Sequence, residues 1–401
     1  MKPRWKLTTL SNIAEVIGRG ITPKYSEDGD YVIINQRCIR NGRVNLENAR
    51  SHDSSSRSVK DIKRLVAGDI LVNSTGVGTL GRTAPWRGAD DLKATVDSHV
   101  TIVRPKLSVN PQWLGYLFSS IEPLIESLGH GSTGQTELAA SSIADIELFY
   151  PPLSTQKQIA SLLGTLDDKI ESNRAQQHLG EQLVRALIER IIDQFSGADF
   201  TTLDAYCTHL KESVQPENLV SGDKYIALEH MPRGSVFLNS WVDAEDAGIS
   251  SNKTRFRQGD LLFGKLRPYF KKVGVAPVSG VCSTDILVIR PRLREFLSLI
   301  TVVASSDALI NSVSASATGT RMPRASWKDI SKWPVPRIAD ETLITLLRPT
   351  NQLIAFSQAL SFQNIRLAEV RDALLPELMS GRMRVDEAGQ LVCEALDEEV
   401  C

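Results

Sequence analysis

Two long stretches of the chain repeat apolar residues at steps of four and three. In residues 153–196 the repeat falls on positions 159, 163, 166, 170, 173, 177, 180, 184, 187 and 191. Steps of this kind predict a heptad seam along one helix, opened by a capping-box pattern of Thr155 and Gln158. The seam is apolar at both ends and polar in its middle, at Asn173, Gln177 and Gly180. At about 1.5 Å per residue the helix would extend roughly 60 Å, more than one compact lobe needs.

The second stretch, residues 338–382, carries the same pattern 184 positions later. The offset matches Ile159 with Leu343, Leu163 with Leu347, and Ile170 with Ile354. Its seam also holds four polar residues, which are Thr350, Ser357, Ser361 and Asn364. We expect the two helices to pair with each other as an antiparallel coiled coil. Ordinary amphipathic core helices are the simpler alternative.

Short runs rich in β-branched residues precede each long helix. Residues 31–35, 69–73 and 100–104 are bounded by Gly, Asp or Pro and predict strands, whereas residues 111–128 have helical spacing. These runs recur: GDILV at 68–72 returns as GDLLF at 259–263, and DSHVTIVRP at 97–105 as STDILVIRP at 283–291. The chain is therefore two copies of one plan, a lobe of mixed strands and helices followed by a long helix.

This pattern predicts an α+β protein in which two pseudo-repeated mixed α/β lobes are separated by the two long helices. We expect the first lobe over residues 1–152, the central helix over 153–196, the second lobe over 197–337 and the C-terminal helix over 338–382. Residues 383–401 contain an acidic run from Asp386 to Glu399, which predicts a solvated tail.

Composition agrees with a globular chain of more than one domain. The 401 residues exceed the roughly 100–150 of a typical domain, and no apolar run approaches the roughly 18–20 residues that span a bilayer. Five scattered cysteines with no CxxC pair predict free thiols, and the N-terminus has no apolar leader segment. We therefore expect a cytoplasmic protein with no membrane partner.

The net charge of -1 conceals a division along the chain. Residues 201–337 carry 18 Lys and Arg against 13 Asp and Glu, whereas residues 338–401 carry 5 against 11. Concentrated positive charge in one lobe is compatible with a nucleic-acid partner even when the overall charge is near zero.

Two segments resemble nucleotide-binding loops, but each lacks a required feature. GDLLFGK at 259–265 satisfies seven positions of a P-loop, yet Leu266 replaces the Ser or Thr that binds Mg²⁺. GVGTLG at 76–81 fits the dinucleotide fingerprint, but Pro85 follows where a helix should open. A buried strand and a flexible loop are the better interpretations.

Other catalytic patterns are missing from the sequence. The Asp-x-Lys fragments at 61–63 and 91–93 are of chance-level significance, and no Asn-Pro-Pro-aromatic or Asp-Pro-Pro-aromatic tetrapeptide of an amino-methyltransferase occurs. The six histidines show neither HExxH nor metal-ligand spacing. We therefore predict no catalytic residues, no metal site and no enzymatic activity for this chain alone.

Two basic clusters remain. Seven cations and one acid, Asp260, lie between Lys253 and Lys272, interleaved with Tyr269 and Phe270. Residues 37–64 carry eight cations against three acids. Each cluster alone fits a solvated surface, but matched clusters in repeated lobes favour a polyanion such as DNA.

The chain resembles the specificity subunits of type I restriction–modification systems over nearly its whole length. The resemblance rests on Trp5 with GITP at 20–23, GDILVNSTGVGTLGRTA at 68–84, PPLSTQKQIASLLGTLDDKI at 151–170, GDLLFGKLRPYFKK at 259–272, CSTDILVIRP at 282–291 and LLPELMSGRMRV at 374–385. Each motif is modest by itself, but their order and repetition are specific.

The resemblance implies two target-recognition domains that bind the two halves of a split double-stranded DNA site. It also implies that the helices bind two modification (methyltransferase) subunits and that the holoenzyme recruits restriction subunits. This chain would hold no cofactor, because S-adenosylmethionine belongs to the methyltransferase subunit, and ATP and Mg to the restriction subunit. Different lobe sequences predict an asymmetric, bipartite site.

We expect DNA contacts from loop and cluster residues of both lobes. These candidates are Arg37, Asn73, Ser74, Thr75, Arg82, Thr133, Gln135, Lys265, Arg267, Lys271, Lys272, Thr320 and Arg321. The candidate partner-binding residues are Ile159, Leu163, Leu166, Ile170, Leu343, Leu347 and Ile354. The alternatives are a self-contained nuclease or methyltransferase, a protein-binding coiled-coil scaffold, and a DNA-binding or scaffold subunit of another multi-subunit DNA-modification complex.

Overall fold

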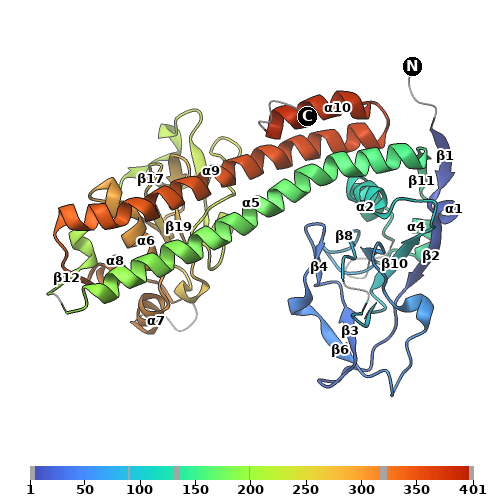
Figure 1. Cartoon of the computed structure of the whole chain (residues 1–401), viewed down its shortest axis with the longest axis horizontal. Helices are drawn as coiled ribbons and strands as arrows, with labels where there is room; N and C mark the ends of the chain where they lie inside the picture. The colour runs from blue at the N-terminus through green and yellow to red at the C-terminus, as the bar shows by residue number, and fades with distance from the viewer. Residues whose placement is uncertain (1–4, 89–90, 131–135, 198, 317–322, 397–401) are drawn as a thin grey trace. The chain divides into compact units, whose positions relative to one another are not determined.

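The computed structural model describes residues 5–88, 91–130, 136–197, 199–316 and 323–396 (Figure 1). The chain divides into two compact units. Unit 1 comprises residues 1–168 and 367–401, and unit 2 comprises residues 169–366. Each unit therefore contains one lobe and a part of both long helices.

The two long helices are α5, Leu153–Gln194, and α9, Asp340–Met379, with 42 and 40 residues. Their pairing is antiparallel, because Asn173 contacts Gln363 and Asn364 whereas Gln177, further along α5, contacts Ser357 and Ser361. The expected fold class, with mixed lobes and two long paired helices, is confirmed.

Polar residues fill the middle of this helix pair. Gln177 Nε2 donates to the Ser357 carbonyl at 2.7 Å and to Ser361 Oγ at 2.6 Å. Gln177 and Ser361 also correspond in the sequence repeat, so equivalent positions of the two helices meet. A buried polar layer favours one helix register over its alternatives. The polar seam positions of the second helix thus take part in pairing, since Thr350, Ser357 and Ser361 are all buried.

The predicted apolar seam of α5 is observed, except that its buried position shifts by one residue near the end of the helix. Leu187 is only half-buried, and Ile188 takes the buried place between Val184 and Ile191. A helix of 3.6 residues per turn drifts against a strict seven-residue repeat, so the buried stripe moves by one residue over a long helix.

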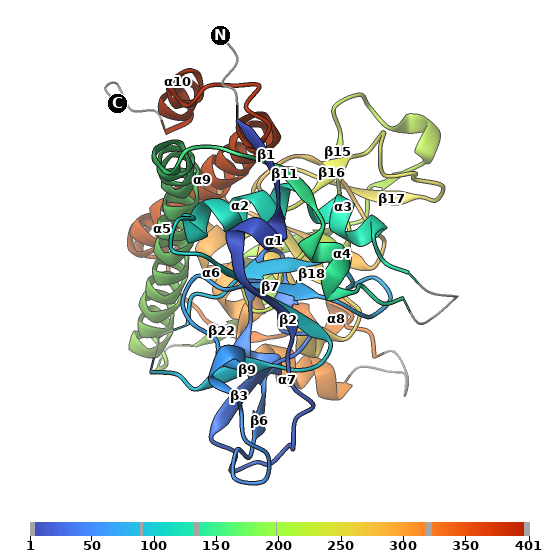
Figure 2. The same ribbon diagram turned by 90° about the vertical axis from the view of Figure 1, so that its right-hand side faces the viewer.

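The lobe of unit 1 contains two main sheets. The four-stranded antiparallel sheet has the order β2 (Ala14–Arg19), β10 (Val100–Pro105), β7 (Ile70–Asn73), β8 (Thr83–Pro85). The three-stranded sheet has the order β6 (Arg50–His52), β3 (Tyr31–Ile34), β9 (Ala94–Val96). Two strand pairs complete it, β1 (Lys6–Thr9) with β11 (Glu147–Tyr150) and β4 (Ile39–Arg40) with β5 (Arg43–Val44). The helices are α1 (Leu10–Ile13), α2 (Pro111–Ser120), α3 (Glu122–Ser127) and α4 (Ala140–Ala144), and α2 passes beside the four-stranded sheet (Figure 2).

The lobe of unit 2 repeats this plan. Its four-stranded sheet has the order β13 (Cys207–Leu210), β21 (Ile286–Pro291), β18 (Leu261–Gly264), β19 (Val273–Val275). A five-stranded sheet has the order β14 (Ser213–Val214), β17 (Lys253–Phe256), β20 (Gly280–Cys282), β15 (Lys224–Ile226), β16 (Val242–Asp243). β12 (Phe200–Thr202) pairs with β22 (Pro334–Pro336), and the helices are α6 (Leu297–Ser305), α7 (Asp307–Ser316) and α8 (Trp327–Ser331).

A buried ion pair explains why the Gly-Asp and Arg-Pro motifs recur. The Arg104 guanidinium donates two hydrogen bonds to Asp69, both at 2.8 Å, and Arg290 donates two to Asp260, both at 2.7 Å. Each aspartate is almost completely buried and also accepts a backbone N–H from the preceding turn. Bidentate pairing of this kind offsets the cost of burying the carboxylate. The Gly-Asp segment at 259–260 is thus structural, and Leu261–Gly264 is a buried strand rather than a phosphate loop.

In each unit, one polar side chain of a long helix forms hydrogen bonds that hold the lobe against that helix, and the two side chains stand at equivalent positions of the repeat. In unit 1, Asp167 of α5 accepts from the Tyr116 hydroxyl of α2 at 2.7 Å and from Arg371 of α9 at 2.8 Å. Burial raises the pKa of the Tyr116 hydroxyl, and the Asp167 hydrogen bond adds to the shift, so the group stays a donor. The equivalent residue 184 positions later is Asn351 of α9. In unit 2 its side chain accepts from the Ser298 N–H at 3.0 Å and donates to the Glu295 carbonyl at 2.6 Å.

The expected solvated acidic tail is wrong for most of its length. Residues Val385–Leu396 form helix α10, which lies along the C-terminal part of α9 (Figure 1). Ala388, Val392 and Leu396 are buried at a four-residue spacing. The acidic residues occupy the other faces of an amphipathic helix, and net charge alone concealed this apolar stripe.

Two further findings concern membrane spans and thiols. No single described helix is long and apolar enough to cross a membrane, although the segments Arg294–Ser305 and Asp307–Ser316, which meet at a bend of 58°, have together the length and composition of a span. Cys38, Cys207 and Cys282 are buried free thiols, as expected, whereas Cys393 is disulfide-bonded, against the expectation.

The Asp167 contact generates a stability prediction. Asp167→Ala should lower the free energy of unfolding by about 1–3 kcal/mol, because it leaves the Tyr116 hydroxyl and Arg371 without this acceptor. Denaturant titration of the purified chain measures the effect. The neighbouring Asp168 is exposed, so Asp168→Ala is the matched control and should change stability by less than about 0.5 kcal/mol. Equal effects of the two variants would contradict the role of Asp167.

Candidate nucleic-acid interface

Strand ends and loops of unit 1 gather at one edge of its four-stranded sheet. The end of β2 and the end of β7 both flank the start of β10, since Arg19 pairs with Thr101 and Asn73 with Val100. We define edge 1 by the side chains that these strand ends and the adjoining loops bring together. They are Arg19, Gln36, Thr75, Arg82, His99 and Glu137.

Hydrogen bonds hold the members of edge 1 in place. Thr75 Oγ1 and His99 Nδ1 are 2.9 Å apart, and Thr75 Oγ1 also lies 3.4 Å from Gln36 Oε1. Arg19 donates to the Leu138 carbonyl at 2.7 Å and forms an ion pair with Glu137 at 2.9 Å. His99 and Glu137 are exposed, and Gln36 and Thr75 are half-buried. The edge therefore presents neutral and charged donors and acceptors on a fixed frame.

Two predicted contact residues of this lobe are buried and do not reach the surface. Ser74 is completely buried, and its Oγ lies 2.6 Å from Thr101 Oγ1. Asn73 is also completely buried and donates from Nδ2 to the Gln36 carbonyl at 3.1 Å. Neither side chain is exposed as a contact residue would need to be, because β7 continues through Asn73 and its sheet neighbours cover both side chains. Among the other candidates, Arg37 is exposed, and Thr75 and Arg82 are half-buried.

The second lobe builds an equivalent edge with the same backbone hydrogen bonds. In the first lobe Ser74 N–H donates to the His99 carbonyl and Leu138 N–H to the Ser74 carbonyl, at 2.8 and 2.9 Å. In the second, Lys265 N–H donates to the Asp285 carbonyl and Ala325 N–H to the Lys265 carbonyl, also at 2.8 and 2.9 Å. Lys265 therefore occupies the place of Ser74, and Asp285 that of His99.

We define edge 2 by the matching residues of unit 2, which are Lys211, Lys265, Leu266, Lys272, Asp285 and Arg324. The bridge between Thr75 and Glu137 in the first lobe recurs between Leu266 and Arg324 in the second. At equivalent backbone positions, the second lobe therefore has Leu266 where the first has Thr75, and Arg324 where the first has Glu137. The two edges share backbone geometry and differ in chemistry.

Positive charge is crowded at edge 2. Burial lowers the pKa of the Lys265 ammonium, and the charges of Arg324 and Lys211 lower it further, whereas Asp285 raises it. Asp285 is 3.4 Å from Arg324. Burial together with Lys211 and Lys265 also lowers the pKa of His209. An anion placed here would relieve the repulsion among these cations.

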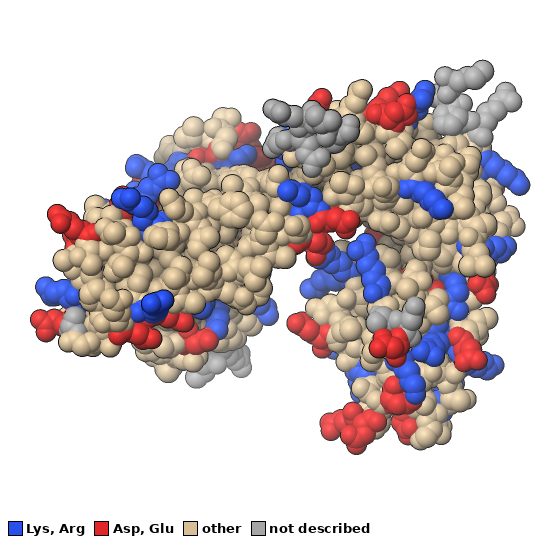
Figure 3. Space-filling view, in the orientation of Figure 1, with Lys and Arg blue, Asp and Glu red and all other residues tan. Residues whose placement is uncertain are grey.

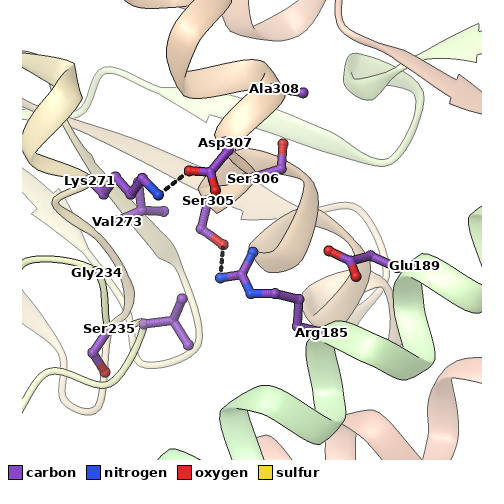
Figure 4. A pocket seen from close by; sticks show the side chains of 11 residues that line it. Arg185, Glu189, Gly234, Ser235, Lys271, Val273, Ser305, Ser306, Asp307 and Ala308 are labelled. Atoms are coloured by element: carbon purple, nitrogen blue, oxygen red, sulfur yellow. Dashed lines mark hydrogen bonds and ion pairs between the residues drawn. The ribbon is translucent and has the colours of Figure 1, made fainter.

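Two predicted cations of the second lobe bind partners within their own lobe. Lys271 forms an ion pair with Asp307, the first residue of α7 (Figure 4). Lys272 donates from Nζ to the Leu228 carbonyl, and burial lowers its pKa. Both are half-buried, so they position the loop rather than project from it. Arg267, by contrast, is exposed.

The predicted candidates Thr133, Gln135, Thr320 and Arg321 lie outside the described residues. The predicted partner-binding residues of the helix seam are inaccessible: Ile159, Leu163, Leu166, Ile170, Leu343, Leu347 and Ile354 are all buried. The heptad pattern identified the residues that pack inside the protein rather than an outer face. Exposed large apolar side chains of the two helices are Leu153, Leu179, Leu183, Phe356 and Phe362.

Sequence analysis missed several residues of both edges. They come from loops or strand ends distant in sequence and lie outside both basic clusters; they are Arg19, His99, Glu137, Asp285 and Arg324. The available signal was the repeat, because His99 and Asp285 each directly precede one of the two matched strands, β10 and β21. Within the described residues no group of three or more His, Cys, Asp or Glu is placed to hold a metal ion. On the face of unit 1 in Figure 3, Lys and Arg are interspersed with Asp and Glu, so individual positions matter more than a continuous basic field.

Edge 1 generates a pH prediction through Asp97, which is buried and accepts the His99 N–H at 2.9 Å. Burial raises its pKa above 3.8. A raised folded-state pKa means that the stability contribution is complete below the unfolded-state pKa and is lost as the pH rises through the folded-state pKa. Asp97→Asn keeps the acceptor oxygen without the charge. The variant should be more stable at neutral pH and lose this pH dependence, measured as melting temperature between about pH 4 and 8. Parallel melting curves for both proteins would contradict the burial effect.

Comparisons with known proteins agree with this arrangement. A family model described as the type I restriction modification DNA specificity domain matches residues 3–179. The type I restriction enzyme MjaIX specificity subunit of Methanocaldococcus jannaschii is 24% identical over 420 residues, covering 96% of this chain and 94% of that protein. The type I restriction enzyme EcoDI specificity subunit of Escherichia coli is 21% identical over 314 residues, covering 68% and 69%.

The fold is shared with a solved structure. The crystal structure of the type I restriction-modification system S subunit from M. genitalium covers 94% of this chain and 96% of its own, with a TM-score of 0.58 and 14% sequence identity. The match to the MjaIX specificity subunit covers nearly the whole of the present chain, and so both lobes and both long helices. Residues 3–179 therefore match the type I restriction modification DNA specificity domain, and the chain is similar over nearly its whole length to a type I restriction enzyme specificity subunit.

Proposed function

We propose that this chain is the DNA sequence-specificity subunit of a type I restriction–modification complex and that each lobe recognises one half of an asymmetric, bipartite site. One observation carries the proposal: the two lobes present different side chains on the same backbone frame. Thr75 and His99 in one lobe correspond to Leu266 and Asp285 in the other. A shared frame with exchanged edge residues suits one binding mode applied to two base sequences.

The chemistry of the edges suits base recognition in a DNA groove. Gln36, Thr75 and His99 offer side-chain donors and acceptors at edge 1, and their mutual hydrogen bonds hold them in fixed positions. Lys265 and Arg324 can donate to guanine, and Asp285 can accept from cytosine. Exposed cations such as Arg37 and Lys211 would neutralise phosphates and provide sequence-independent affinity.

The proposal assigns chemistry to partner subunits. Two modification subunits would bind the chain and hold S-adenosylmethionine, and restriction subunits with ATP and Mg would join the holoenzyme. The chain itself would direct these subunits to DNA and catalyse no step. The exposed apolar side chains of α5 and α9 are better candidates for partner contact than the buried seam. The similarity to type I specificity subunits favours this complex over another multi-subunit DNA-modification complex.

A methylation map of the source genome at base resolution, with and without the gene, tests the function. The expected result is that one gapped, asymmetric methylated motif disappears on deletion. A palindromic motif, or no change in a strain whose modification subunits are expressed, would contradict the proposal.

The two edges generate a separate prediction for paired variants. His99→Ala should relax base preference in one half of the motif, and Asp285→Ala in the other half, because each side chain lies on one lobe. Removing a base-specific contact typically costs about 1–3 kcal/mol of discrimination, or roughly 5- to 150-fold. Binding of the complex to duplex libraries randomised in one half at a time measures this effect. Each variant is the control for the other, and relaxation of both halves by one variant would contradict the assignment.

A further inference from the structure

We infer that the turn at residues 266–272 of the second lobe is a DNA-contacting element whose strained backbone keeps a cation, Arg267, where the first lobe has glycine. The inference rests on the proposed function and deepens it. It assigns Arg267 to a DNA phosphate and the exposed ring of Tyr269 to a neighbouring nucleotide.

Two residues of this turn have left-handed backbone conformations. Arg267 has φ 50° and Lys271 has φ 49°, and the short 3-10 turn Pro268–Phe270 lies between them. Side chains with a Cβ are disfavoured in this region, and glycine is the residue that usually occupies it.

In the first lobe, glycine occupies the equivalent left-handed positions, where it causes no strain. The Asn73 N–H donates to the Arg82 carbonyl, as the Gly264 N–H does to Lys272, so these loops start and end at equivalent points. Arg267 is the third residue after Gly264, as Gly76 is the third after Asn73, and Gly76 has φ 98°. Lys271 directly precedes Lys272, as Gly81 precedes Arg82, and Gly81 has φ 85°. Glycine therefore fills both left-handed positions in one lobe, and cations fill them in the other.

The two strained cations have different roles. Lys271 pairs with Asp307 and its carbonyl accepts from Gly234 N–H at 3.3 Å, so it anchors the turn to its own lobe. Arg267 donates its backbone N–H to the Pro323 carbonyl at 3.0 Å, while its side chain is exposed. Retaining a charged side chain at a strained, exposed position points to a binding role that offsets the strain.

An aromatic side chain stands beside this cation. Tyr269 is 52% exposed, and its ring packs edge-on against Phe270 with centroids 4.8 Å apart. The exposed guanidinium of Arg233 covers the Phe270 ring at 3.8 Å, and that of Arg267 lies 6.0 Å from it. An exposed ring flanked by arginines is typical of nucleic-acid surfaces, where rings contact nucleotides and guanidinium groups neutralise phosphates.

The turn is rigid enough to present these groups in fixed positions. Pro268 restricts the backbone, Lys271 N–H donates to the Pro268 carbonyl at 2.8 Å, and the Lys271–Asp307 ion pair closes the far side. A preorganised turn loses little conformational entropy when it binds.

Arg267→Gly separates strain from binding in one variant. Measured in the complex with its modification subunits, the variant should melt about 2 °C higher than the wild type, because strain is relieved. It should bind a random-sequence DNA duplex several-fold more weakly, with a salt slope reduced by about one. Arg294 is exposed in the same lobe, lies beyond the end of β21 that is opposite to edge 2, and has an ordinary negative φ. The control Arg294→Gly should therefore lower the melting temperature and leave the salt slope unchanged.

Tyr269→Ala tests the ring contact. Its expected effect is a several-fold loss of affinity for the same duplex with no change of salt slope, because the ring carries no charge. Normal DNA binding together with reduced retention of the modification subunits would mean that the turn is a protein-binding surface, and this would overturn the inference.

The outcomes distinguish this inference from the function it rests on. A stabilised Arg267→Gly variant with unchanged affinity and salt slope would overturn the DNA contact, and an unstabilised one would overturn the strain. In either case, a wild-type complex that binds its methylated motif leaves the proposed function standing. Failure of the wild-type complex to bind any duplex would instead contradict both.

Discussion

A buried carboxylate held by an arginine determines the position of the central strands in each lobe. Asp69 and Asp260 stand at the start of the central strand, and Arg104 and Arg290 stand near the end of its antiparallel neighbour. With the carboxylate almost wholly removed from water, loss of the arginine would leave an unpaired buried charge, which is strongly destabilising. The pair therefore favours one register of the two strands, and that register sets which residues emerge at the opposite end of the sheet.

The candidate interface follows from this constraint. Once Val100 pairs with Asn73 and Ile286 with Gly264, the residues just beyond these pairs meet at one edge of each sheet. Thr75 then lies beside His99 in one lobe, and Lys265 donates to Asp285 in the other. The frame is rigid and duplicated, whereas the side chains on it differ. A duplicated protein can in this way bind two unlike half-sites without altering its core.

Much of the architecture was predictable because burial leaves a periodic signal. The heptad spacing predicted both long helices, and the repeated Gly-Asp and Arg-Pro motifs predicted matched lobes. The site was less predictable. Ser74 looked like a loop residue but is covered by the sheet, and Lys271 and Lys272 looked like surface cations but bind Asp307 and the Leu228 carbonyl. Linear charge density cannot distinguish a cation that faces solvent from one that anchors a loop.

The sequence by itself determined the duplication, the two helices and the strand cores, because hydrophobic periodicity and chain repetition are properties of the order of residues. Only the tertiary structure decided which side chains share an edge, that Asp167 and Asn351 fasten the lobes, and that the acidic C-terminal run is a packed helix. It also showed that Arg267 and Lys271 occupy left-handed positions filled by glycine in the other lobe. The physical reason is that these features depend on contacts between residues distant in the chain and on backbone dihedral angles, and neither is written in local composition.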